Sequence, residues 1–132
     1  MVAAFFKISC PVCQYAFPYL ERIFKAYSGG PVTLVGISQD DKQATSGFAR
    51  EYDISFPLLL DDTRTYPASN AYGLTNVPSI FLISPGGKVE ASSVGWSKRD
   101  IEDMNARVAK AAGVAAAPIF KPGEDVAEFK PG

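Results

Sequence analysis

Two apolar runs with a helical pattern between them constrain the fold of this chain more than any other feature. The runs from Val2 to Ile8 and from Val32 to Ser38 have the nearly continuous apolar character of buried strands. Apolar side chains recur at helical spacing from Val12 to Tyr27, and Gly29-Gly30-Pro31 predicts the end of that helix. A strand, a helix and a strand in this order predict a layered α/β fold.

The rest of the chain predicts a mixed sheet between helices. Its apolar runs are short, and turn-forming residues such as Pro85-Gly86-Gly87-Lys88 separate them. Together with the first three elements, they predict an α/β sandwich around a mixed central sheet. In chain order we expect a polar helix at 41–52, a short strand at 56–60, a helix or irregular turn at 63–72, and a hairpin of 80–84 with 89–95.

A final helix and a tail complete the predicted organisation. Ser97 is the expected N-cap and Gly113 the expected end of the helix, so residues 1–113 form one predicted domain. Trp96, just before this helix, either lines a substrate groove or packs in the core. Residues 114–132 contain three prolines and no periodicity, which predicts a surface wrap or a disordered end. The expected inner face of the helix carries Ile101, Met104, Val108 and Ala111.

Composition argues against several kinds of partner. Thirteen basic and fourteen acidic residues give a formal charge of -1, and no basic cluster is longer than Lys98-Arg99. A nucleic-acid partner is therefore not expected. No apolar run has the length of a membrane span. The sequence starts within a predicted strand, so we expect upstream residues that include a signal or a membrane anchor. The expected location is extracytoplasmic, with the cytoplasm as the alternative.

Both cysteines of the chain lie at the junction between the first strand and the first helix. Cys10 is expected at the helix N-terminus and Cys13 one turn inside the helix. Unpaired amides and the helix dipole at that end stabilise a thiolate, so Cys10 is the expected nucleophile. Cys13 can then attack a mixed disulfide on Cys10 and release the substrate, which completes a two-electron cycle. A metal site is not expected, because the chain has no third cysteine and no histidine.

Two segments make the chain similar to a known family. The sequence FFKISCPVC followed by Pro18, and the sequence FPLLLDD followed by AYGLTNVPSIFLISPGGKV, resemble the TlpA/ResA-like branch of thioredoxin-fold proteins, near the alkyl hydroperoxide reductase and thiol-specific antioxidant proteins. The resemblance covers Val2 to about Gly113. It implies that Pro78 is cis and faces the cysteines, and that the backbone of Val77 pairs with a bound substrate strand. An ordinary proline at the start of a strand is the alternative for Pro78.

The chain departs from that family at several positions. Ser9 stands where thioredoxins usually have Trp, and Val12 stands where strongly oxidising CPHC proteins have His. Ala4 and Ala16 stand where carboxylates help to move the proton of the resolving thiol. The leading β-hairpin of the family is missing from the sequence. Its absence predicts a sheet edge that is uncovered or is paired with a second copy in a homodimer.

The combined prediction is a thiol-disulfide oxidoreductase of thioredoxin-like fold. Cys10 and Cys13 are the expected catalytic residues, and Val77 and Pro78 the expected substrate contact. No organic cofactor or metal is expected, and the expected partners are a protein dithiol or disulfide and a second redox protein. A redox-inert binding scaffold is the alternative that the missing carboxylates favour. A weak thiol peroxidase is a further alternative, although Lys7 stands where peroxiredoxins have Thr.

Overall fold

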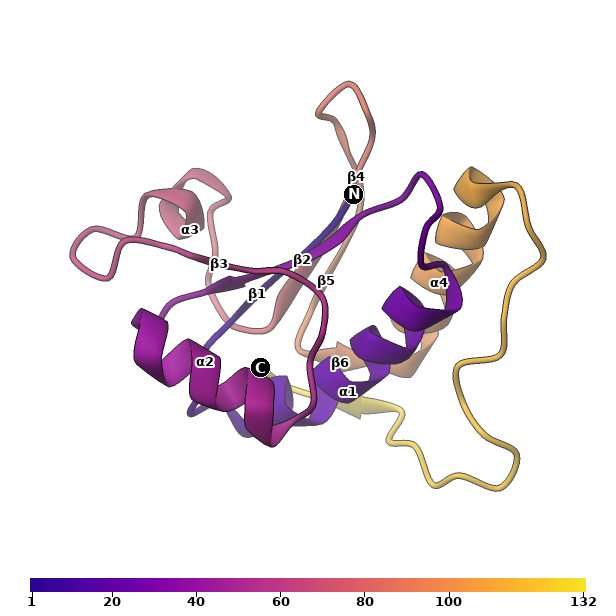
Figure 1. Ribbon diagram of the computed structural model, residues 1–132, viewed down its shortest axis with the longest axis horizontal. Coiled ribbons are helices and arrows are strands. Elements are labelled where there is room, and N and C mark those ends of the chain that lie inside the picture. Colours follow the sequence, from indigo (N-terminus) through magenta and orange to yellow (C-terminus); the bar gives the residue numbers. More distant parts are fainter.

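Strand β1 (Val2–Phe6) is the central strand of a five-stranded sheet in the computed structural model of residues 1–132 (Figure 1). It pairs in parallel with β2 (Leu34–Ser38) and antiparallel with β4 (Ser79–Ile83). Strand β3 (Leu58–Leu60) adds to β2 in parallel, and β5 (Val89–Val94) adds to β4 antiparallel. The order β3-β2-β1-β4-β5 confirms the predicted mixed sheet. All five side chains of β1 are buried, which explains its continuous apolar run.

Neighbouring side chains of β1 show which helices cover each face of the sheet. The ring of Phe6 lies 4.3 Å from that of Phe17 and 4.9 Å from that of Phe48, centroid to centroid. The ring of Phe5 points to the opposite face, where it lies 5.0 Å from Tyr72. The helices are α1 (Pro11–Ala26), α2 (Lys42–Glu51), α3 (Pro67–Ala71) and α4 (Lys98–Ala112). Helices α1 and α2 therefore share one face, and the segment that follows α3 covers the other (Figure 1).

Helix α4 lies against α1 on the Phe6 face, where the hydroxyl of Tyr27 donates to Asn105 at 2.8 Å. Ser97 caps α4 by accepting a hydrogen bond from the Asp100 N–H at 3.2 Å, and Gly113 ends it at φ +72°, both as predicted. The predicted inner face is right except at Ala111, which is exposed. Its place is taken by Ala109, because the buried stripe follows positions four residues apart. None of the helices combines the length and apolar character that a bilayer crossing requires.

Residues 114–132 run back from the end of α4 toward β6 and contact α1 and α4 on the way (Figure 1). Ile119 and Val126 are buried in the same core cluster as the sheet residues. The segment ends in β7 (Phe129–Lys130), which pairs antiparallel with β6 (Trp96–Ser97). Because this segment has little regular structure, its backbone groups depend on side chains of other elements for hydrogen bonds.

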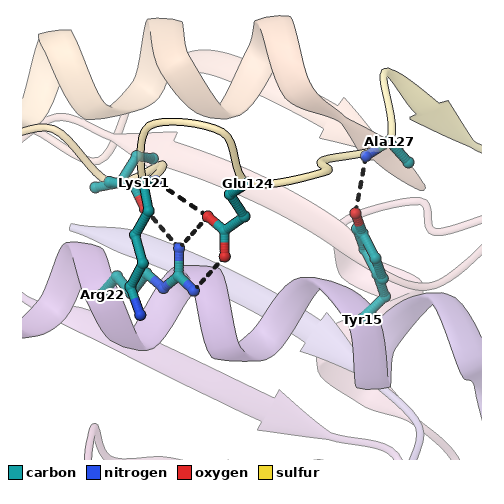
Figure 2. Close-up of polar contacts among 6 residues, drawn as sticks. Tyr15, Arg22, Lys121, Glu124 and Ala127 are labelled. Carbon is teal, nitrogen blue, oxygen red and sulfur yellow. Dashed lines mark hydrogen bonds and ion pairs between the residues drawn. The ribbon is translucent and has the colours of Figure 1, made fainter.

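Helix α1 supplies several of these partners (Figure 2). The guanidinium of Arg22 donates to both carboxylate oxygens of Glu124, at 2.7 and 2.8 Å, and to the carbonyl of Ile119 at 2.8 Å. The Tyr15 hydroxyl accepts from the Ala127 N–H at 2.9 Å. From the other side, the indole N–H of Trp96 donates to the Ala127 carbonyl at 2.6 Å.

The Arg22–Glu124 ion pair makes the attachment of this segment sensitive to acid. The hydrogen bond from Arg22, with one from the Lys121 N–H, lowers the pKa of Glu124 from 4.5 to about 2. Since the folded-state pKa is below the unfolded value, the pair stabilises the fold above about pH 4.5. That contribution is lost as the pH falls toward 2.

Candidate active site

The strand-to-helix junction holds the two cysteines in fixed positions. The Ile8 N–H donates to Asp40 at 2.8 Å, and the Ile8 carbonyl accepts from the Gln14 side chain at 2.8 Å. Cys10 follows as the N-cap of α1, and its Sγ accepts a hydrogen bond from the Cys13 N–H at 3.2 Å. A negative charge on this sulfur would lie at the positive end of the helix dipole.

The two thiols differ in access to solvent. Both are free in the structure, so it represents the reduced pair. Cys10 is half-buried and Cys13 is fully buried, with no exposed surface. An external disulfide can therefore approach Cys10, while Cys13 can be reached only from inside the site.

The loop before β4 lies next to the cysteines, although it is 67 residues away in the sequence. The Val77–Pro78 peptide bond is cis, as the resemblance implied. The Cys10 thiol donates to the Val77 carbonyl at 3.5 Å, and the Val77 N–H donates to no group of the protein. The structure thus brings together all four residues that the sequence assigned to the site. It also leaves one backbone donor of the loop available to a bound strand.

The buried Cys13 thiol resists losing its proton. Burial is the main cause that raises its pKa above the ordinary value of 9.0, and the hydrogen bond with Cys10 adds to it. Ala16 lies one turn further along α1 and Ala4 lies in β1, and both are fully buried. Neither position offers a carboxylate to accept that proton.

Two buried carboxylates elsewhere in the chain already have hydrogen-bond partners. Glu21 accepts from the N–H of Ser55 at 2.9 Å and from its hydroxyl. Asp61 accepts from the N–H and the hydroxyl of Ser69, at 2.8 and 2.7 Å. Burial alone would raise the pKa of Asp61, but the hydrogen bonds, led by those from Ser69, outweigh it and lower the pKa. Glu21 thus holds the loop before β3, and Asp61 ties the loop after β3 to α3. Neither residue was among the expected site residues.

The aromatic side chains around the first helix have packing roles. Trp96 has no exposed surface and contacts the ring of Tyr15 edge-on, with centroids 5.1 Å apart. It therefore packs in the core and does not line a surface groove. Tyr15 and Tyr27 add hydrogen bonds to the 114–132 segment through their hydroxyls.

A small hollow of about 160 Å³ lies beside the Val77 loop, lined by Lys7, Gln39 and residues 74–77. A larger cavity of about 230 Å³ lies between the end of α1 and the beginnings of β1 and β2. Because the cysteines lie near the other end of these strands, the larger cavity is not part of the site. No three Cys, His, Asp or Glu side chains lie together as a metal ion would require.

Comparison with known proteins identifies the family of this chain. Residues 1–92, which include both cysteines and the Val77 loop, match the AhpC/TSA family. The chain belongs to the AhpC/TSA family. Within this family it is a thioredoxin-like protein related to thiol-disulfide oxidoreductases of the ResA, DsbE and StoA kinds. That relationship confirms the resemblance seen in the sequence.

Individual relatives of this AhpC/TSA protein are distant. It is 33% identical over 81 residues to the thiol-disulfide oxidoreductase ResA of Bacillus subtilis, a match that covers 61% of this chain and 44% of ResA. It is 29% identical over 139 residues to the chloroplastic protein SUPPRESSOR OF QUENCHING 1 of Arabidopsis thaliana, covering 99% of this chain and 12% of that protein. The chain thus spans less than half the length of either relative.

A solved structure shares the fold of this AhpC/TSA protein. It is the crystal structure of a thiol:disulfide interchange protein of the DsbE kind from Chlorobium tepidum, with a TM-score of 0.75 at 23% identity. The match covers 85% of this chain and 79% of that one. It confirms the predicted thioredoxin-like α/β fold.

Proposed function

We propose that this protein is a thiol-disulfide oxidoreductase that exchanges a Cys10–Cys13 disulfide with protein thiols. The observation that carries the proposal is the pairing of an accessible thiol at a helix N-terminus with a buried thiol one turn on. The carbonyl of Val77 lies 3.5 Å from the accessible sulfur. Val77 and Pro78 are the proposed substrate contact, since the free Val77 N–H offers a hydrogen bond to an extended strand.

The exchange is reversible, and in the reducing direction it passes electrons from the two cysteines to a substrate disulfide. The Cys10 thiolate attacks one sulfur of a substrate disulfide, so that a mixed disulfide forms and the other substrate sulfur leaves as a thiolate. Cys13 then loses its proton and attacks the Cys10 sulfur. The Cys10–Cys13 disulfide forms and the second substrate thiol leaves. Two electrons and two protons pass from the pair to the substrate, and a second redox protein would restore the dithiol.

The alternative is a redox-inert scaffold of the same fold. The raised pKa of Cys13 and the alanine at position 16 favour it, because both slow the resolving step. The extracytoplasmic location and the homodimer stay predictions.

Equilibration with glutathione distinguishes a thiol-disulfide oxidoreductase from a redox-inert scaffold. We expect the pair to pass reversibly between dithiol and Cys10–Cys13 disulfide as the ratio of reduced to oxidised glutathione changes. Acid quenching, alkylation and mass spectrometry measure the fraction oxidised. Cys13→Ser is the matched control, because it cannot form the internal disulfide. A pair that stays in one state over the whole range of ratios would identify the inert scaffold.

Ala16→Glu tests whether proton removal from Cys13 limits turnover. In the native protein, release of the mixed disulfide should speed up about tenfold per pH unit between about pH 6 and 9, because the thiolate fraction rises by that factor below the raised pKa. A carboxylate at position 16 that accepts the proton should speed release near neutral pH and flatten this dependence. Stopped-flow measurement of release provides the rate.

Ala16→Gln is the control for the Ala16 experiment, since it adds the same bulk without the charge. Attack by Cys10 should change little in either variant. If Ala16→Glu folds but resolves no faster than Ala16→Gln at any pH, then water or another group already serves as the base.

A further inference from the structure

The end of the 114–132 segment lies against the loop that the proposed function assigns to the substrate. The Asn76 side-chain amide donates to the Gly132 carbonyl at 3.4 Å. Gly132 is so close to Val77 that a Cβ at position 132 would lie 2.7 Å from the Val77 carbonyl oxygen. Only a residue without a side chain can occupy this place without moving its neighbours.

Gly95 also lies close to the backbone of residues 130–132. Its N–H donates to the Pro78 carbonyl at 2.8 Å, so Gly95 is tied to the same loop. At φ +75° it adopts a conformation that favours glycine, and a Cβ there would lie 2.5 Å from the Lys130 carbonyl oxygen. Residues 130–132 are therefore enclosed between Gly95 and Val77. Nothing in the local sequence pattern of the segment marks this contact.

Two parts of the chain thus lie close to the Val77 carbonyl oxygen. The Cys10 thiol donates to it at 3.5 Å, and Gly132 lies so close that a Cβ built on it would be 2.7 Å away. An extended substrate strand that pairs with Val77 uses both its N–H and its carbonyl. The N–H is free in this structure, whereas Gly132 lies against the carbonyl.

Only the last part of the segment needs to move for the carbonyl to become free. The preceding part keeps its own attachments, from Arg22 to Glu124 and from Trp96 to Ala127. Phe129, Pro131 and Gly132 are exposed. Displacement of residues 130–132 therefore breaks the pairing of Lys130 with Trp96 but leaves the core covered.

We propose that residues 130–132 are a specificity element that occupies part of the substrate-docking position, an inference that rests on the proposed function. Small or flexible disulfides reach Cys10 without pairing with the Val77 carbonyl. An extended protein strand must displace residues 130–132 first. The segment thus lowers the reactivity of protein disulfides relative to small disulfides, because only protein disulfides require the free energy of that displacement.

Gly132→Val tests this inference, because the added side chain cannot fit against Val77 and should displace the segment. The kcat/KM for insulin should rise about fivefold, the equivalent of about 1 kcal/mol for one recovered backbone hydrogen bond. The kcat/KM for oxidised glutathione should change less than about twofold. A chain without Pro131 and Gly132 should behave in the same way. Lys121→Ala, an exposed change in the same segment away from the site, should leave both values unchanged.

Alkylation provides a readout that does not require redox turnover. The reduced protein is treated with iodoacetamide or with an iodoacetyl group on an extended peptide, and labelling of Cys10 is followed by mass spectrometry. The ratio of peptide to iodoacetamide rates should rise in both altered chains. Equal ratios in the native and altered chains, or a fall, would overturn the inference. If no variant reduces insulin but the ratio rises, the proposed function fails while residues 130–132 are still shown to restrict access.

Discussion

Replacing Cys10 with serine is expected to abolish catalysis of insulin reduction, leaving only the rate of dithiothreitol alone. The Cys10 sulfur is the one of the pair that solvent reaches, and Cys13 has no exposed surface from which to attack a protein disulfide. A serine hydroxyl keeps the N-cap hydrogen bond to the helix but is not a nucleophile toward sulfur at neutral pH. The rate of insulin precipitation measures the loss.

Cys13→Ser should fail at the next step. Cys10 still attacks, but no second thiol resolves the mixed disulfide, so a covalent adduct between protein and substrate should accumulate. Non-reducing electrophoresis or mass spectrometry detects it. Melting temperatures close to that of the native protein control for folding. Two variants that reduce insulin as fast as the native protein would support the inert scaffold.

Trp96→Ala should destabilise the fold by about 3–5 kcal/mol, the usual cost of truncating a buried aromatic side chain. Trp96 has no exposed surface, and its ring lies 5.0 Å from Tyr19 and 5.1 Å from Tyr15. Its N–H also donates to the Ala127 carbonyl. The change therefore leaves a cavity between α1 and the 114–132 segment and removes one attachment of that segment. Urea unfolding followed by circular dichroism measures the free energy of unfolding.

Trp96→Phe separates the two contributions of the indole. The variant keeps most of the ring packing but loses the N–H. We expect it to lower the free energy of unfolding by about 1–3 kcal/mol, less than Trp96→Ala, because the Ala127 carbonyl loses its partner and the ring is smaller. A decrease in the free energy of unfolding below about 1 kcal/mol for Trp96→Ala would contradict the structure, because removal of a fully buried indole from a packed core destabilises a protein by more than that.

Local sequence patterns determined most of the secondary structure and the positions of the two cysteines, which are one half of the candidate site. Continuous apolar runs and the turn at 85–88 predict β1, β2 and the β4–β5 hairpin, because strand burial and turn chemistry depend on neighbouring residues. Ser97 and Gly113 predict the ends of α4 for the same reason. The spacing of Cys10 and Cys13 at a strand-to-helix junction places one thiol at the helix end and the other inside it. The resemblance to a family added Val77 and Pro78.

Only the tertiary structure determined which distant residues contact one another across the sheet and in the core. The contact between Cys10 and Val77 joins residues 67 positions apart and depends on the antiparallel pairing of β1 and β4, which no local pattern encodes. The position of 114–132 depends on partners such as Arg22 and Trp96 in other elements, because the segment has no periodicity and cannot satisfy its own backbone groups. The close approach of Gly132 to Val77 follows from that position. Contacts of this kind arise from packing between distant elements, and so they appear only when the whole chain is folded.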